Sequence, residues 1–111
     1  QASNAPVQFS LKQSGLIADI TVTPARVGSA EIHISIGSLV GSFAQMTSVS
    51  ARMSLPSKSI PTGPVELVRT SPNHYTAVVN FPFSGLWQIE YLVKPDPSRT
   101  VLFTTNVKIG E

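Results

Sequence analysis

The stretch Phe81-Pro82-Phe83-Ser84-Gly85-Leu86-Trp87-Gln88-Ile89-Glu90-Tyr91 decides how this chain folds. It leads from the end of one strand through a turn into a second strand, which carries the only tryptophan. In that second strand Trp87, Ile89 and Tyr91 stand at every other position, so they share one face. Gly85 suits the turn, because glycine accepts a positive φ that other residues resist. Large aromatic side chains on one strand face predict a β-core built around this hairpin.

The rest of the chain alternates apolar with polar residues in the same way, between regularly spaced turn signals. Strands are predicted at 7–11 (an edge strand), 16–23, 32–36, 49–55, 65–68, 75–81, 87–93 and 101–109. Residues 37–46 contain two glycines and are predicted to form a loop, and the proline-rich stretch 56–64 a surface connection. Seven or eight short strands without a helix predict an all-β, antiparallel sandwich of immunoglobulin or fibronectin type. A closed barrel is compatible with the same alternation.

Length and composition favour a single domain of this kind. The chain has 111 residues, nine prolines, seven glycines and only 13% charged residues, which suits an all-β protein. Residues 1–5 (Gln-Ala-Ser-Asn-Ala) look like a remnant of an expression vector, so the domain is expected to span 6–111. Both ends suggest a domain cut from a longer protein.

The charged and sulfur-containing residues argue against several classes of function. The eight Lys and Arg residues are scattered and the net charge is only +2, so binding to nucleic acid is not expected. The absence of cysteine excludes disulfides, thiolate metal sites and a thiol nucleophile. No apolar run reaches the roughly 18 to 20 residues that a membrane span needs.

Catalysis is not expected either, and no small-molecule substrate is evident. The chain holds six carboxylates and two histidines, and no motif places an acid–base pair beside a nucleophile. Ser84 does not lie in a Gly-x-Ser-x-Gly elbow, so it is interpreted as a turn residue.

Four residues are candidate metal ligands, namely His33, His74, Met46 and Met53. Imidazole nitrogens bind copper, and thioether sulfurs prefer Cu(I). None of the four stands at a spacing such as His-x-His or Met-x-x-Met, and isolated surface histidines and core methionines are the commoner roles. Met53 in particular alternates with apolar residues and is expected in the core.

A binding surface is the remaining possibility. The predicted loop 37–46 carries Leu39, Val40 and Phe43, which is more apolar than a solvated loop requires. These residues either fold back over the end of the sandwich or form a contact patch for another domain.

The order of these segments resembles the YtkA-like domain that follows the membrane helices in bacterial copper resistance proteins of the CopD type. The resemblance covers about residues 16–109 and is carried by an alternating strand that ends in proline, a strand of branched aliphatics, a Pro/Gly-rich link and two motifs near the C-terminus. The segments are Ile20-Thr21-Val22-Thr23-Pro24, Ile32-His33-Ile34-Ser35-Ile36, Ile60-Pro61-Thr62-Gly63-Pro64, His74-Tyr75-Thr76-Ala77 and Phe81-Pro82-Phe83-Ser84-Gly85-Leu86-Trp87-Gln88-Ile89. The motif residues in that family fix a hairpin and a core and are not ligands.

The resemblance implies an immunoglobulin-like, extracytoplasmic domain attached to a membrane protein of copper transport or resistance. Its partner would be the membrane portion of its own polypeptide or a copper chaperone. The chain departs from copper-binding relatives, because the stretch 51–58 has one methionine and no histidine where they carry a Met- and His-rich segment. Two other hypotheses stay open: a generic adhesion or spacer module without metal, and a free-standing copper carrier that needs at least two of the four candidate ligands to converge. Membrane helices before residue 6 in the full gene product would favour the domain of a copper transport protein.

Overall fold

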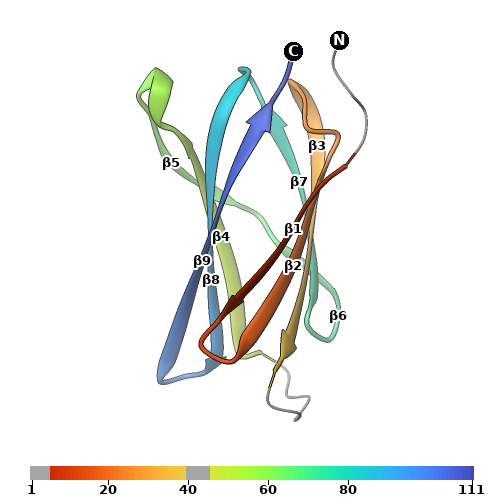
Figure 1. Ribbon diagram of the computed structural model, residues 1–111, viewed down its shortest axis with the longest axis vertical. Coiled ribbons are helices and arrows are strands. Elements are labelled where there is room, and N and C mark those ends of the chain that lie inside the picture. Colours follow the sequence, from red (N-terminus) through yellow and green to blue (C-terminus); the bar gives the residue numbers. More distant parts are fainter. Residues whose placement is uncertain (1–5, 40–45) are drawn as a thin grey trace.

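The computed structural model describes residues 6–39 and 46–111, and these fold into nine strands and one 3₁₀ turn, η1 (Pro56–Lys58) (Figure 1). The strands are β1 (Val7–Gln13), β2 (Leu16–Thr23), β3 (Gly28–Ser38), β4 (Ser48–Leu55), β5 (Ile60–Val65), β6 (Val68–Ser71), β7 (His74–Phe81), β8 (Gly85–Asp96) and β9 (Arg99–Ile109). The predicted all-β class is therefore confirmed.

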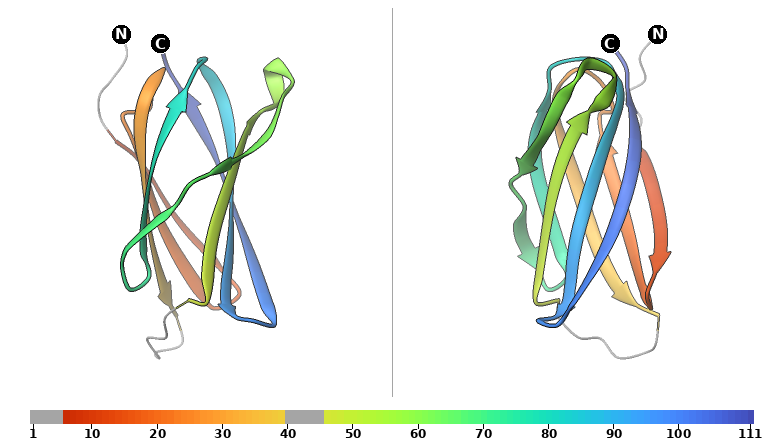
Figure 2. Two further views of the ribbon diagram at one scale, coloured as in Figure 1. Left: turned by 180° about the vertical axis from the view of Figure 1, so that it is seen from behind. Right: turned by 90° about the vertical axis from the view of Figure 1, so that its left-hand side faces the viewer.

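The strands form two antiparallel sheets that pack face to face (Figure 2). One sheet has five strands in the order β1-β2-β3-β7-β6, and the other has four in the order β5-β4-β8-β9. This arrangement is an immunoglobulin-like sandwich and not a closed barrel. β1 lies at an edge, as its position in the sequence predicted.

The core lies between the sheets and is built from the alternating apolar positions. Trp87 is 2% exposed and Ile89 and Tyr91 are fully buried, so the predicted inward face of this strand is confirmed. The Trp87 ring meets Phe81 edge to face, with 5.4 Å between ring centroids. Trp87 Nε1 donates a hydrogen bond to the Phe83 carbonyl oxygen at 2.9 Å, which ties the core ring to the preceding turn. Gly85 has a φ of +138°, as the turn requires.

The prediction for residues 56–68 was wrong. The stretch expected to be a surface connection contains η1 and β5, and the strand expected at 65–68 is divided between β5 and β6. β5 pairs only with β4 at the edge of its sheet, where Pro61 and Pro64 are tolerated because edge strands need fewer ladder donors. The chain then crosses from the four-stranded to the five-stranded sheet between Val65 and Val68.

The glycine-containing stretch 37–46 is only partly described. Gly37 and Ser38 extend β3 rather than forming a loop, and Leu39 is half exposed. Val40 and Phe43 lie outside the described residues, so the expectation about their packing stays a prediction. Met46 is buried, and its amide donates to Asn73 Oδ1 at 2.7 Å.

Candidate functional site

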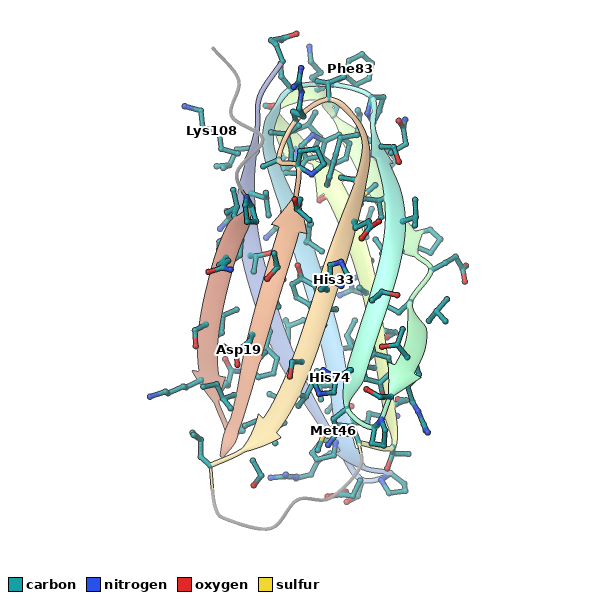
Figure 3. All side chains as sticks on the ribbon, turned by 90° about the vertical axis from the view of Figure 1, so that its right-hand side faces the viewer. Asp19, His33, Met46, His74, Phe83 and Lys108 are labelled. Atoms are coloured by element: carbon teal, nitrogen blue, oxygen red, sulfur yellow. The ribbon has the colours of Figure 1, made fainter. Side chains whose placement is uncertain are left out.

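The outer face of the five-stranded sheet carries both histidines. β3 and β7 turn alternate side chains outward, so His33 on β3 and His74 on β7 are exposed while their neighbours Ile34 and Tyr75 are buried. Figure 3 shows both imidazoles on this face. The fold therefore places the two histidines on one surface, although they are 41 positions apart in the chain.

The register between the strands sets their spacing. His33 lies opposite Thr76, and His74 lies opposite Ser35, so the two histidines are diagonal neighbours. Diagonal neighbours in an antiparallel pair lie roughly 7 to 8 Å apart, within reach of long side chains. Two imidazoles at this spacing can approach one ion from adjacent strands.

A shallow depression of about 200 Å³ lies between these side chains. Ser35 lies at the centre of this depression, between two neighbouring strands. It pairs with His74 of β7 on one side and with Asp19 of β2 on the other, and His33 precedes it by two residues on β3. Asp19, His33 and His74 thus surround one small residue, and Thr70 completes the wall. Among residues 6–39 and 46–111, no group of three or more His, Cys, Asp or Glu side chains stands close enough to hold a metal ion.

Glu31 orients one of the two rings. Its Oε1 lies 2.9 Å from His33 Nε2. A proton on Nε2 would donate to this carboxylate and leave Nδ1 as the nitrogen with a free electron pair. Both side chains are about half exposed, so the contact contributes little to stability and acts mainly on ring orientation.

The two methionines do not join the histidines. Met53 lies on β4 of the other sheet and packs, partly buried, against the core, which agrees with the expectation for it. Met46 is 5% exposed and belongs to the core cluster. The structure therefore brings together two of the four candidate ligands, and the sulfur atoms belong to residues packed inside the sandwich.

Asp19 is a neighbour of the histidines that the sequence does not predict. The alternation of its strand places Asp19 only on the solvent face. Alternation identifies the outward face of each strand, but the cross-strand register that brings Asp19 beside Ser35 cannot be read from one strand at a time. Ser84, the other side chain considered, donates its hydroxyl to Glu111 Oε2 at 2.6 Å.

The sequence matches no known protein family and no curated protein. Its fold, however, is found in known structures. A DUF4785 family protein from Legionella pneumophila aligns with a TM-score of 0.68 and 14% identity, over 89% of this chain and 30% of that protein. FetP from uropathogenic Escherichia coli, expressed recombinantly in the periplasm, aligns with a TM-score of 0.67 and 11% identity over 96% of this chain and 95% of FetP. A copper-bound variant of FetP aligns with a TM-score of 0.59 and 10% identity, over 92% of this chain and 95% of that one. At these identities the likeness establishes the fold.

The described residues contain no helix that is long and apolar enough to cross a bilayer. The chain spans about a third of the Legionella protein and nearly all of FetP.

Proposed function

We propose that this chain is an extracytoplasmic, copper-handling β-sandwich domain of a bacterial copper transport or resistance protein, and that it acts by binding rather than by catalysis. The observation that carries the proposal is the full-length likeness to FetP, a variant of which binds copper. The resemblance of its C-terminal motifs to the YtkA-like domains of CopD-type proteins supports the same role. The partner would be the membrane portion of the same polypeptide or a copper chaperone.

The outer face of the five-stranded sheet supplies the chemistry for this role. His33 and His74 offer imidazole nitrogens, and Asp19 offers a carboxylate at the rim of the same depression. Nitrogen and oxygen donors suit Cu(II), whereas Cu(I) prefers thioethers, and the described methionines pack against the core. The face is therefore proposed to take Cu(II) in preference to Cu(I), with the site completed by water or by a side chain of the partner.

A titration of the purified domain with Cu(II) and Cu(I), against competing chelators, tests the proposal. We expect stoichiometric Cu(II) binding with a dissociation constant of roughly micromolar order. The paramagnetic ion should broaden the NMR signals of His33 and His74 before others. His33→Asn and His74→Asn should each weaken binding by at least about tenfold, while Met53→Leu serves as the matched control and should bind like the parent. The absence of binding at high micromolar copper would contradict the metal site. So would a variant that carries both His33→Asn and His74→Asn and still binds Cu(II) as tightly as the parent.

A spacer or adhesion module is the second candidate. The specific observation in its favour is that the same fold occurs as about a third of the longer Legionella protein, so the sandwich can serve as one unit of a larger chain. This role needs no metal. A domain that binds no copper, and whose full gene product carries further β-domains in place of membrane helices, would support it.

A further inference from the structure

The β9 edge of the four-stranded sheet supports a further inference that does not depend on copper binding. We propose that β9 pairs antiparallel with β9 of a second copy of this chain and forms a two-fold symmetric dimer. β9 is an end strand of its sheet and eleven residues long. Its pairing with β8 is regular from Ile109 to Val101, so no bulge interrupts this part of the sheet edge. The backbone N–H and C=O groups along such an edge are free to pair with another strand.

The ends of this free edge are defined by neighbouring contacts. Beyond Ile109, the Gly110 amide donates to the Ala25 carbonyl at 3.0 Å, and its carbonyl accepts from the Val27 amide at 2.8 Å. The segment 25–27 therefore covers the edge at that point. β1 packs near β9 but belongs to the other sheet and does not extend this ladder. In the described part of the chain, the strand that pairs with β9 between Arg99 and Lys108 is β8, on one side of β9.

The other three edge strands in the described part of the chain carry features that discourage pairing. β5 contains two prolines and a glycine. β6 has four residues and a register shift between Arg69 and Ser71. β1 has seven residues and a lysine, Lys12, in its second half. From Val101 to Val107, β9 contains no charged residue, no proline and no register shift. Such a segment is the one most prone to edge-to-edge pairing.

Symmetry fixes the register of the dimer. The inner faces of the two paired four-stranded sheets must lie on the same side, and a one-residue slip would exchange the faces. The two-fold axis must therefore pass midway between one residue and the same residue of the second copy. An axis at Thr104 aligns the whole open edge. Thr104 then faces its own mate, Val101 faces Val107, and Thr100 faces Lys108. The cations Arg99 and Lys108 do not oppose each other, so no like charges meet in this register. A second copy can thus pair along the whole of β9 without opposing like charges.

Sedimentation velocity over a concentration series tests the proposal, with circular dichroism to confirm folding of each variant. We expect the parent to show a reversible, concentration-dependent dimer. Thr104→Asp and Thr104→Lys each place like charges on the axis, so each alone should self-associate roughly tenfold or more weakly. Because the position faces itself, mixing the two variants should restore a mixed dimer. Ser50→Asp, on the exposed face of the interior strand β4, is the matched control and should dimerise like the parent.

Hydrogen exchange provides a second readout. On dilution, amides along the outer edge of β9 should lose protection while those of β8, paired on both sides, keep it. A parent that stays monomeric throughout the series would overturn the proposal. So would a dimer that both Thr104 variants leave unchanged, since its interface would then lie elsewhere.

Discussion

Tyr91 shows how a single polar atom is accommodated in the core. The side chain is fully buried, and its hydroxyl shares a 2.9 Å hydrogen bond with Thr105 Oγ1 across the β8–β9 pair. Burial raises the pKa of Tyr91 to about 12, because the ionised phenolate would lose its hydration, and the bond to Thr105 offsets only part of this effect. The hydroxyl is stable in the core only while it keeps its proton.

We therefore expect stability to fall at high pH. In the unfolded chain the tyrosine ionises at its ordinary pKa of 10.0, and in the folded chain at a pKa of about 12. Its contribution is therefore complete below pH 10 and is lost as the pH rises through 12. The loss should reach about 2 to 3 kcal/mol in the free energy of unfolding, measured by urea denaturation at several pH values. Tyr91→Phe should cost about 1 kcal/mol at neutral pH and flatten the alkaline fall. Tyr75→Phe leaves Tyr91 in place, so this control variant should show the same loss of stability at alkaline pH as the parent. If Tyr91→Phe lost stability just as steeply, the effect would belong to other groups.

At the scale of the strand, the sequence predicts strands correctly where apolar and polar residues alternate strictly. It fails where a segment becomes a strand only through pairing with a neighbouring strand. The strand of Trp87 and the strand at 16–23 have the predicted inner faces, because period-two patterns follow directly from backbone geometry. β5 was missed because Pro61 and Pro64 normally end strands, and only its place at a sheet edge makes them compatible with one. That place depends on contacts with β4, which are remote in sequence.

The same limit applies to predicting the candidate site from the sequence. His33 and His74 could be named as exposed strand residues from the sequence, yet their closeness depends on the β3–β7 register. Asp19 enters through the β2–β3 register. Register is set by the whole hydrophobic pattern and by turn geometry, so a single strand does not reveal which outward residues become neighbours.

Asn73 connects the β6–β7 turn to β3 and to Met46, which precedes β4, and the sequence does not predict this role. Asn73 is 1% exposed with a φ of 62°; its side chain accepts the Met46 amide, and its carbonyl accepts the Ile36 amide at 2.9 Å. Asn73→Gly should lose the Met46 bond but keep the backbone conformation, at a cost of about 1 to 3 kcal/mol. Asn73→Ala should cost about 1 kcal/mol more, because alanine resists this positive φ. Urea denaturation measures both, and equal stability of the two variants would show that the φ angle contributes nothing.

On the scale of the whole molecule, the two sheets share a single core. The buried residues of both form one hydrophobic cluster, so neither sheet can lose its packing without exposing the inner face of the other. A domain of this size with one core is expected to unfold in a single cooperative step.

Two matched substitutions test this cooperativity. Ile20→Val in β2 and Ile89→Val in β8 each remove one methyl group from a buried position, on opposite sheets, and each should cost about 0.5 to 1.5 kcal/mol. In both variants the unfolding midpoint should shift equally by Trp87 fluorescence, which reports on the four-stranded sheet, and by the NMR signals of His33 and His74, which report on the other. Val78→Ala, at a position 74% exposed, should stay within about 0.5 kcal/mol of the parent. If Ile20→Val moved the histidine signals and left the tryptophan transition in place, the sheets would be separate folding units. The outer histidine face could then open without loss of the Trp87 core, and copper binding would be expected to stabilise only its own sheet.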